Sequence, residues 1–174
     1  VRGTTEVVCP TPIVAGGLVV ACSGRNGPII AIRPGGTGDV TSSHVAWKHS
    51  RGGAYVPTGV AVDGRLYTIR DEGVLTCYDV ATGKRIWETA IGDPKKGESA
   101  SAAPIAWNGL VFIGNAGGDI KGVKGRMYAL DAKTGKIVWE FYLVPKAEGD
   151  PTRGPQGASP LDASTWGNSQ QGVP

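Results

Sequence analysis

The sequence predicts an all-β fold made of repeated four-stranded antiparallel sheets, and three observations support this. Glycine and proline together account for 40 of the 174 residues, which is well above their usual share, and both disfavour helix interiors. The apolar segments are short, are bounded by turn residues and show no ten-residue amphipathic helical pattern. A pattern of strand, glycine turn and strand also recurs along the chain, which indicates a repeat architecture.

The first half of each repeat reads as a hairpin, and three copies of it align. The copies are PTPIVAGGLVVA, VPTGVAVDGRLYT and AAPIAWNGLVFI. In each copy a glycine opens the second apolar stretch, and these glycines (Gly17, Gly64 and Gly109) lie 47 and 45 residues apart. A period of about 40–50 residues is typical of repeat proteins.

The second half of the repeat carries the motif D-x-x-T-G-x-x-x-W. It occurs in CYDVATGKRIW and in YALDAKTGKIVW, and a looser copy with a stretched loop ends at Trp47. The aspartate can accept hydrogen bonds from backbone N–H groups two residues on. The glycine supplies the positive φ that closes a short hairpin. The tryptophan projects from one face of the next strand, so we expect it to dock one repeat on its neighbour.

Each repeat therefore contains four strands, predicted in the second repeat at about 56–62, 65–70, 74–78 and 85–89. Four-stranded sheets repeated radially form a β-propeller. The predicted fold is a partial propeller over 1–144, with about three blades at 10–50, 54–92 and 100–144. Because propellers close with about 4–8 blades, we expect the remaining blades outside this sequence. Residues 145–174 are predicted to be a long irregular loop or a truncated tail.

Charge and hydropathy exclude several functional classes. The net charge is +3, with 18 basic and 15 acidic residues, which argues against a dedicated nucleic-acid-binding protein. No apolar run reaches the roughly 18 residues that a membrane span needs. The sequence also contains no phosphate-binding loop, nucleophile elbow or zinc signature.

The cysteines and histidines show no metal-binding spacing. Cys9, Cys22 and Cys77 have no CxxC pattern and are interpreted as small buried hydrophobic residues. A disulfide between Cys9 and Cys22 is the alternative in an oxidising compartment. His44 and His49 are five residues apart, which does not align them on one strand face. We expect both histidines at the surface or in turns.

The third repeat differs in the connection between its second and third strands. This connection, GNAGGDIKGVKGR over 114–126, holds five glycines and one acid, Asp119, among Lys121, Lys124 and Arg126. So many glycines leave backbone N–H groups open to an anionic ligand. Two interpretations follow from the residues alone: a ligand-binding loop, or a solvated hairpin with a surface ion pair.

These motifs resemble those of a known family. The D-x-x-T-G-x-x-x-W copies resemble the tryptophan-docking motif of pyrroloquinoline-quinone (PQQ) propeller repeats. The stretch SAAPIAWNGLVFIGNAGGDIKGVKGRMYALDAKTGKIVWEFYLVP resembles the PQQ-dependent alcohol dehydrogenases, and this resemblance runs from Ser101 to about Trp166. It implies an eight-bladed propeller with PQQ, and a Ca²⁺ or lanthanide ion, in its central funnel. The earlier repeats, through Ile91, are similar to general PQQ-like repeats without catalytic signatures.

The resemblance also implies site residues. In the family a stretch of the form G-x-S-G-A-E-x-G-V-R-G lies against the quinone, and its acid ligates the metal. Asp119 occupies the place of that acid, and Ala116, Gly117 and Gly118 match the preceding Ser-Gly-Ala, which contacts the cofactor. Ser101 is the nearest match to a hydroxyl residue that contacts PQQ.

The sequence departs from the family pattern in four ways. Asp119 is one methylene shorter than glutamate, and Ala116 lacks the serine hydroxyl. The loop has one extra residue around 120–121, and the adjacent cysteine pair that forms a disulfide above the quinone is absent. The family's asparagine ligand, its aspartate base and the tryptophan under the quinone correspond to positions beyond Pro174. We therefore expect this chain to supply one wall of the site.

Two functions from different classes follow. The first is part of a quinoprotein dehydrogenase that oxidises a small-molecule alcohol or sugar and passes electrons to a cytochrome or a quinone. The second is a non-catalytic PQQ-like propeller that acts as a protein-binding scaffold, as the outer-membrane assembly lipoprotein does. Both place the protein in the periplasm or the bacterial cell envelope, and neither requires nucleic acid or a membrane span.

Overall fold

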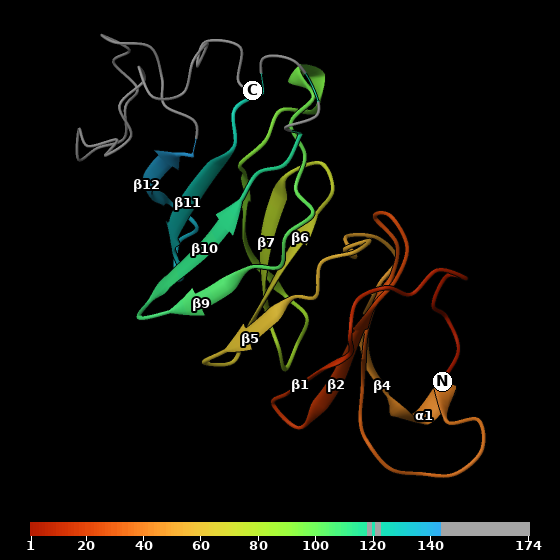
Figure 1. The fold of residues 1–174 in the computed structure, drawn as a ribbon. Helices are drawn as coiled ribbons and strands as arrows, with labels where there is room; N and C mark the ends of the chain where they lie inside the picture. The colour runs from red at the N-terminus through yellow and green to blue at the C-terminus, as the bar shows by residue number, and fades with distance from the viewer. Residues whose placement is uncertain (118–119, 121–122, 144–174) are drawn as a thin grey trace, which may run out of the picture.

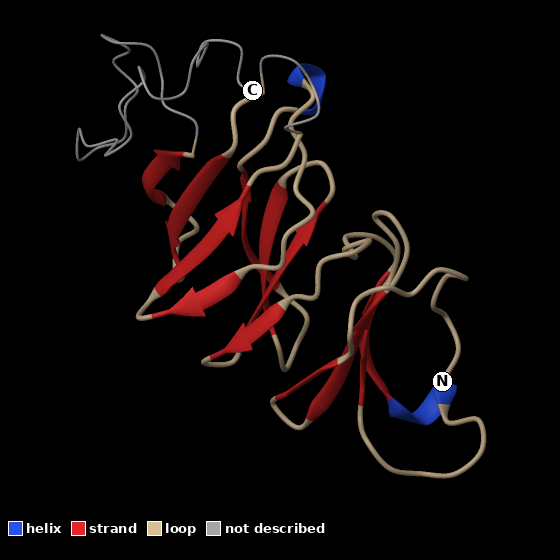
Figure 2. Cartoon of the chain, viewed as in Figure 1, coloured by secondary structure: helices blue, strands red, loops and turns tan. Residues whose placement is uncertain are grey.

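The chain forms three four-stranded antiparallel sheets, so the predicted all-β class is confirmed. The computed structural model describes residues 1–117, 120 and 123–143. Each sheet consists of four consecutive strands in chain order. The sheets stand side by side with their first strands adjacent (Figure 1), and strands and loops make up nearly all of the described chain (Figure 2). This is the arrangement of neighbouring propeller blades.

The strands are short, and each sheet is a meander. The first sheet contains β1 (Ile13–Ala15), β2 (Leu18–Cys22), β3 (Ile29–Ile32) and β4 (Val45–His49). The second contains β5 (Val60–Val62), β6 (Arg65–Arg70), β7 (Val74–Asp79) and β8 (Arg85–Ala90). The third contains β9 (Ile105–Trp107), β10 (Leu110–Gly114), β11 (Arg126–Asp131) and β12 (Ile137–Tyr142).

The first hairpin of each sheet closes through the turn that the sequence indicates. The two central residues, at 16–17, 63–64 and 108–109, all have positive φ, between 48° and 74°. Two positive φ values in succession define a type I′ turn, whose twist matches that of the flanking strands. The repeated glycine therefore fixes the hairpin register at the same point of every repeat.

Two short helices lie outside the sheets and were not predicted. The helix α1 (Thr41–His44) lies in the stretched loop of the first repeat, and the 3₁₀ turn η1 (Pro94–Lys96) lies between the second and third repeats. Asp93 caps η1, because its side chain accepts a hydrogen bond from the N–H of Lys95 at 3.1 Å. No helix in the described part of the chain is long and apolar enough to cross a membrane.

The first strand of the second repeat is shorter than predicted. The sequence predicts a strand from about 56, but β5 begins at Val60. Pro57 has no N–H to donate to a strand ladder. At Gly59 the backbone approaches β6 so closely that an added Cβ would lie 2.6 Å from the carbonyl oxygen of Tyr67. The segment 56–59 is therefore a connection that lies against the sheet without extending it.

The motif tryptophans dock each repeat on the next, as predicted. Trp47 donates its indole N–H to the carbonyl of Val80 at 2.8 Å, and Trp87 donates to that of Ala132 at 3.1 Å. Each ring packs directly on the motif glycine of the following repeat. A Cβ on Gly83 would lie 2.6 Å from the ring of Trp47, and the equivalent contact in the next repeat is equally close. The tryptophan and the glycine therefore form a single contact between sheets.

A second docking contact lies two residues after each of these tryptophans. His49 Nε2 is 2.7 Å from the carbonyl oxygen of Gly83, and the Thr89 hydroxyl donates to the carbonyl of Gly135 at 2.7 Å. Because a carbonyl only accepts, the ring nitrogen of His49 is the donor. The expectation that His49 lies at the surface or in a turn is therefore wrong, since it is a half-buried β4 residue at a repeat boundary.

The aspartate of the motif organises the turn that receives the tryptophan. Asp131 Oδ1 accepts from both the N–H and the hydroxyl of Thr134, each at 2.8 Å. Asp79 makes the same two bonds to Thr82, at 2.8 and 2.6 Å. These bonds favour the charged carboxylate, the hydroxyl bond most strongly, and they lower the pKa of both aspartates below the ordinary 3.8.

The core consists of two apolar clusters, one between each pair of neighbouring sheets. Cys22 and Cys77 are buried in these clusters, and burial raises the pKa of each thiol to about 11. The prediction of buried cysteines is correct for these two and wrong for Cys9, which is exposed. All three thiols are free, so the alternative disulfide between Cys9 and Cys22 is not formed.

Docking strength can be separated from backbone strain by comparing two glycines. Gly135 and Gly109 have nearly the same φ, 72° and 74°, but only Gly135 lies against a tryptophan. Gly135→Ala and Gly109→Ala should each lower the free energy of unfolding by about 1–2 kcal/mol through backbone strain. Gly135→Ala should lower it by roughly 1–3 kcal/mol more, because the added methyl group collides with Trp87. Urea unfolding measures both losses, and equal losses would contradict the docking contact.

The motif aspartates should make stability depend on pH. Because the folded-state pKa of Asp131 is lowered, its contribution to stability is complete above the unfolded pKa and is lost as the pH falls through the folded pKa. Asp131→Asn should therefore lower the free energy of unfolding at pH 7, and this loss should shrink towards pH 3. Asp63→Asn, at an exposed turn, makes the same charge change and serves as the control. A loss at Asp131 that does not vary with pH would contradict the assignment.

Candidate cofactor-binding site

The described candidate residues lie in two segments at the same edge of the third sheet. Ser101 belongs to the segment 98–101 between η1 and β9, and Ala116 and Gly117 follow the end of β10. Gly118 and Asp119 lie outside the described residues, so their contacts with a cofactor and a metal remain predictions. The geometry below concerns only Ser101, Ala116, Gly117 and the residues that hold them.

A short backbone bridge joins the two segments. Ser99 N–H donates to the carbonyl of Ala116 at 3.1 Å, and Ala116 N–H donates to the carbonyl of Ser99 at 2.7 Å. The structure therefore brings the loop after β10 beside the segment that carries Ser101. The N–H of Ala116 is used in this bridge and is not available to a ligand, whereas its methyl group is not part of the bridge.

Gly117 is required because the two segments approach closely. Its φ is +114°, a conformation that side-chain-bearing residues rarely adopt, and an added Cβ would collide with the carbonyl oxygen of Gly97. After this point the loop turns back: Ile120 N–H donates to the carbonyl of Gly117 at 2.9 Å, and Val123 N–H donates to that of Ile120 at 3.1 Å. The described parts of the loop are therefore folded against the segment before β9.

The backbone beside Ser101 is held in place through its neighbour Ala100. Ala100 is buried and donates its N–H to the carbonyl of Asp71, in the β6–β7 turn, at 2.9 Å. Ser101 is exposed, and its hydroxyl has no hydrogen-bond partner among the described residues. A fixed backbone with an uncommitted hydroxyl suits recognition of a polar ligand atom.

Asn115 closes the base of the loop and was missed in the sequence. Its Oδ1 accepts from Arg126 N–H at 2.5 Å, and its own N–H donates to the carbonyl of Arg126 at 3.1 Å. Its Nδ2 also donates to the carbonyl of Lys124 at 3.4 Å. The sequence feature that could have predicted this role is an asparagine among glycines, because an asparagine side chain commonly bonds to nearby backbone groups.

Arg126 is a half-buried residue at the start of β11 and not a solvated loop cation. Its side chain is 15% exposed and pairs with Glu98 and with Glu140. The sequence placed Arg126 only as a cation near the loop acid. Its carboxylate partners lie 28 residues before it and 14 residues after it in the chain, and local spacing does not reveal either of them.

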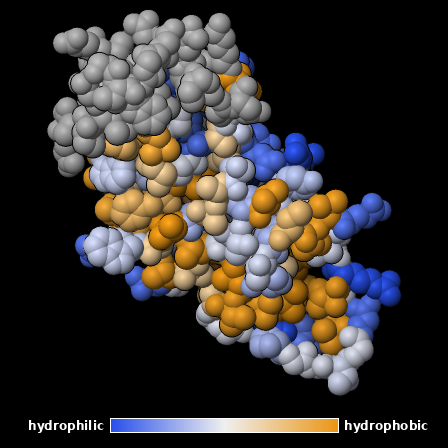
Figure 3. All heavy atoms as spheres, in the orientation of Figure 1, coloured by the Kyte–Doolittle hydropathy of each residue, from blue (hydrophilic) through white to orange (hydrophobic). Residues whose placement is uncertain are grey.

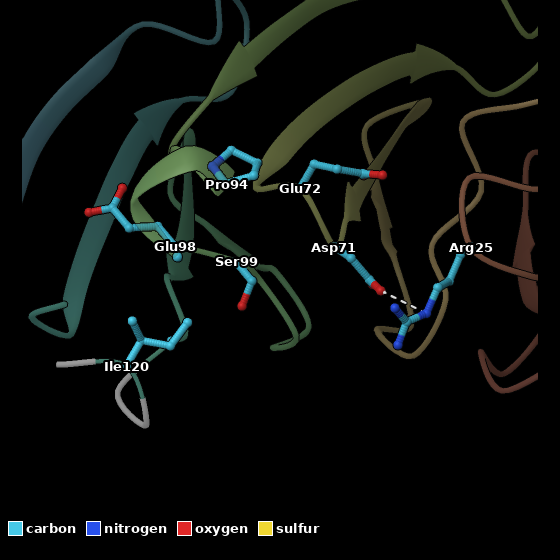
Figure 4. A pocket seen from close by; sticks show the side chains of 9 residues that line it. Arg25, Asp71, Glu72, Pro94, Glu98, Ser99 and Ile120 are labelled. Carbon is cyan, nitrogen blue, oxygen red and sulfur yellow. Dashed lines mark ion pairs between the residues drawn. The ribbon is translucent and has the colours of Figure 1, made fainter.

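A pocket of about 410 Å³ lies beside the bridge and opens at this loop edge. Figure 4 shows Arg25 and Asp71 turned toward each other on one side, with Ser99 and Ile120 on the other. The Arg25–Asp71 ion pair measures 3.5 Å. Burial raises the pKa of Asp71, and the charge of Arg25 opposes this rise. The pocket shares the Ser99–Gly117 wall with the candidate site.

Ala116 carries only a methyl group and Gly117 has no side chain, which leaves room for a planar ring beside this wall. Ser101 is exposed and has no hydrogen-bond partner among the described residues. These features are compatible with one side of a flat quinone ring. The residues described in the structure contain no group of three or more histidine, cysteine, aspartate or glutamate side chains that could hold a metal ion. The predicted metal ligand, Asp119, lies outside that part of the chain.

Four-stranded sheets that dock on one another through tryptophan and glycine define a segment of a β-propeller. The family model described as "Outer membrane protein assembly factor BamB" matches residues 2–89 and 25–160. The chain belongs to this family of PQQ-like propeller repeats.

The sequence relatives include quinohemoprotein alcohol dehydrogenases, which confirms the resemblance. The chain is 40% identical over 116 residues to lupanine 17-hydroxylase [cytochrome c] of a Pseudomonas species. It is 41% identical over 114 residues to quinohemoprotein alcohol dehydrogenase ADH-IIG of Pseudomonas putida. These matches cover 66% and 64% of this chain, but only 16% and 15% of the relatives. The chain therefore spans about a sixth of their length.

A solved structure shows the same fold. The quinohemoprotein alcohol dehydrogenase from Comamonas testosteroni superposes with a TM-score of 0.67 at 28% sequence identity. The superposition covers 85% of this chain and 23% of that one. The three sheets of this chain therefore correspond to about a quarter of that enzyme.

The role of Asn115 is testable with two substitutions at one position. Asn115→Ala removes the acceptor for Arg126 N–H and should lower the free energy of unfolding by about 1–2 kcal/mol. Hydrogen exchange at the Arg126 amide should accelerate. Asn115→Asp keeps the acceptor oxygen and should retain most of the protection. Equal exchange in both variants would show that the side chain does not close the loop.

Proposed function

We propose that the protein containing this chain is a PQQ-dependent dehydrogenase that oxidises an alcohol or sugar, and that this chain supplies one wall of its quinone and metal site. The observation that carries the proposal is the bridge between Ser99 and Ala116. It joins the segment that carries Ser101, two residues after Ser99, to a loop whose sequence resembles the family's quinone-binding stretch. Identity of 41% to a quinohemoprotein alcohol dehydrogenase supports it.

In this proposal each residue has a defined part. Ser101 donates a hydrogen bond to a polar atom of the quinone, while Ala116, Gly117 and Gly118 form the small-residue surface beside it. Asp119 provides one oxygen ligand to Ca²⁺ or a lanthanide ion. When bound, the quinone accepts the substrate's electrons, and the metal polarises its carbonyl. The base that removes the substrate proton belongs to another part of the propeller.

The proposal extends to organisation, acceptor and location. The blades at 10–50, 54–92 and 100–144 join further blades around one axis. Residues 145–174 lie outside the described residues, and the prediction of an irregular loop or a truncated tail stays a prediction. A cytochrome or a quinone receives the electrons, and the protein resides in the periplasm or cell envelope. A relative whose name includes cytochrome c supports this choice of acceptor.

The second candidate function is a protein-binding scaffold without PQQ. The description of the matching family model, an outer membrane assembly factor, favours it. So do the apolar side chains over the first strands of the sheets (Figure 3). Val14 on β1, Ile105 on β9 and Trp107 on β9 are 79%, 64% and 68% exposed. Such surfaces can bind other proteins.

PQQ binding by the full-length protein separates the two functions. Titration with PQQ and Ca²⁺ or a lanthanide, followed by quinone absorbance, should show saturable binding that depends on the metal. Asp119→Ala should abolish the metal dependence, and Ser101→Ala should weaken binding about 5–10-fold through loss of one hydrogen bond. Ser50→Ala, an exposed serine at the end of β4, is the control. Absence of binding in the wild type would favour the scaffold.

A further inference from the structure

We propose that Glu98 and Arg126 are positioning residues: their ion pair sets the relative placement of the segments that carry Ser101 and Ala116, and PQQ binds more weakly without it. This inference rests on the proposed function, because it assigns a role in that same site. Neither residue belongs to the surface proposed to contact the quinone, so both act through the backbone.

The pair closes a ring of contacts around the candidate wall. Glu98 directly precedes Ser99, which is bridged to Ala116. Ala116 follows Asn115, which bonds to both backbone groups of Arg126: its Oδ1 accepts from the N–H, and its own N–H donates to the carbonyl. Arg126 Nη2 in turn donates to Glu98 Oε1, which completes the ring. The ion pair is the only side-chain to side-chain link in this ring, so breaking it opens the ring at one point.

Several contacts besides Glu98 hold the guanidinium of Arg126 in place. Its Nη1 is 3.2 Å from Glu140 Oε1 and 3.4 Å from the hydroxyl of Tyr142. Its guanidinium lies 5.5 Å from the ring centre of Tyr128 and 5.4 Å from that of Tyr142. Cation–π contacts and a second carboxylate hold the planar group in one orientation. The ion pair with Arg126 therefore fixes the position of Glu98 relative to β11 and β12.

Glu98 transmits this position to the segment before β9. Its Oε2 accepts from Asp93 N–H at 3.0 Å, and its own N–H donates to the carbonyl of Asp93 at 3.2 Å. Glu98 thus closes the η1 turn while it pairs with Arg126. The segment that follows carries Ser99 and, two residues further, Ser101.

Burial distinguishes this ion pair from the others in the described part of the chain. The side chains of Glu98 and Arg126 are 16% and 15% exposed, whereas those of Arg85 and Glu88 are 35% or more exposed. Exposed ion pairs contribute little. Arg126→Met leaves the half-buried carboxylate of Glu98 without its cation, which draws water or moves the backbone. Glu98→Gln leaves Arg126 paired with Glu140 alone and removes the ionic link to the segment before β9. Loss of Glu98 or Arg126 should therefore displace the segments that they join.

The test uses the full-length protein with Glu98→Gln, Arg126→Met and Arg126→Lys, and with Arg85→Met as the matched control at an exposed pair. Hydrogen exchange is followed at the Ser99 and Ala116 amides without PQQ. PQQ affinity is then titrated with Ca²⁺ or a lanthanide. Glu98→Gln and Arg126→Met should raise exchange at both amides at least tenfold and weaken PQQ binding about tenfold. Arg126→Lys should restore part of both, and Arg85→Met should change neither.

The outcomes separate this inference from the proposed function. Unchanged exchange in Glu98→Gln and Arg126→Met overturns the positioning role. Raised exchange with unchanged PQQ affinity also overturns it, because the pair then serves stability alone. If the wild type binds no PQQ, the proposed function fails and the role toward the quinone falls with it. In that case the exchange data still show whether the pair places the two segments.

Discussion

The contact of a tryptophan ring with a glycine of the next repeat is the constraint on which the rest of the structure depends. Among the described residues the apolar core lies between the sheets, because the buried residues gather in clusters shared by neighbouring sheets. Trp47 and Trp87 fix the distance between neighbouring sheets, because each ring packs on a glycine of the next repeat and its indole N–H donates to a backbone carbonyl there. Ala132 O also accepts from the hydroxyl of Tyr67 at 3.0 Å, which adds a buried bond at the second boundary.

This arrangement leaves one edge of the sheets available for functional variation. The β6–β7 turn is short, whereas the corresponding connection in the third repeat is long and rich in glycine. Because docking occurs through the motif turns, the long connection does not disturb it. The described part of the connection lies against the segment before β9, where Ala116 is bridged to Ser99, two residues before Ser101. A rigid scaffold with variable loops is a common way to build a binding site.

The sequence predicted best what depends on neighbouring residues. Asp79, Thr82 and Gly83 lie within five positions, so their turn chemistry can be recognised directly in the motif, and the hairpin glycines are equally local. The contact of His49 with Gly83 joins residues 34 positions apart and escaped prediction. Cys9 was predicted to be buried from its residue type alone, but its position in the fold leaves it exposed.

The candidate site was predicted in part for the same reason. Resemblance to the family gave Ser101, Ala116 and Gly117, and the structure shows that the segments carrying them are bridged. Asn115 and the partners of Arg126 came only from the fold, because their roles arise from contacts between segments. The sequence also could not show that the guanidinium of Arg126 is already paired with Glu98 and Glu140.

The claim that this edge is one wall of a quinone site is tested most directly by a crystal structure of the full-length protein with PQQ and Ca²⁺. The account predicts the quinone against Ala116 and Gly117, with one of its polar atoms about 3 Å from the hydroxyl of Ser101. PQQ bound at a different place on the propeller, or no PQQ at saturating concentration, would contradict it.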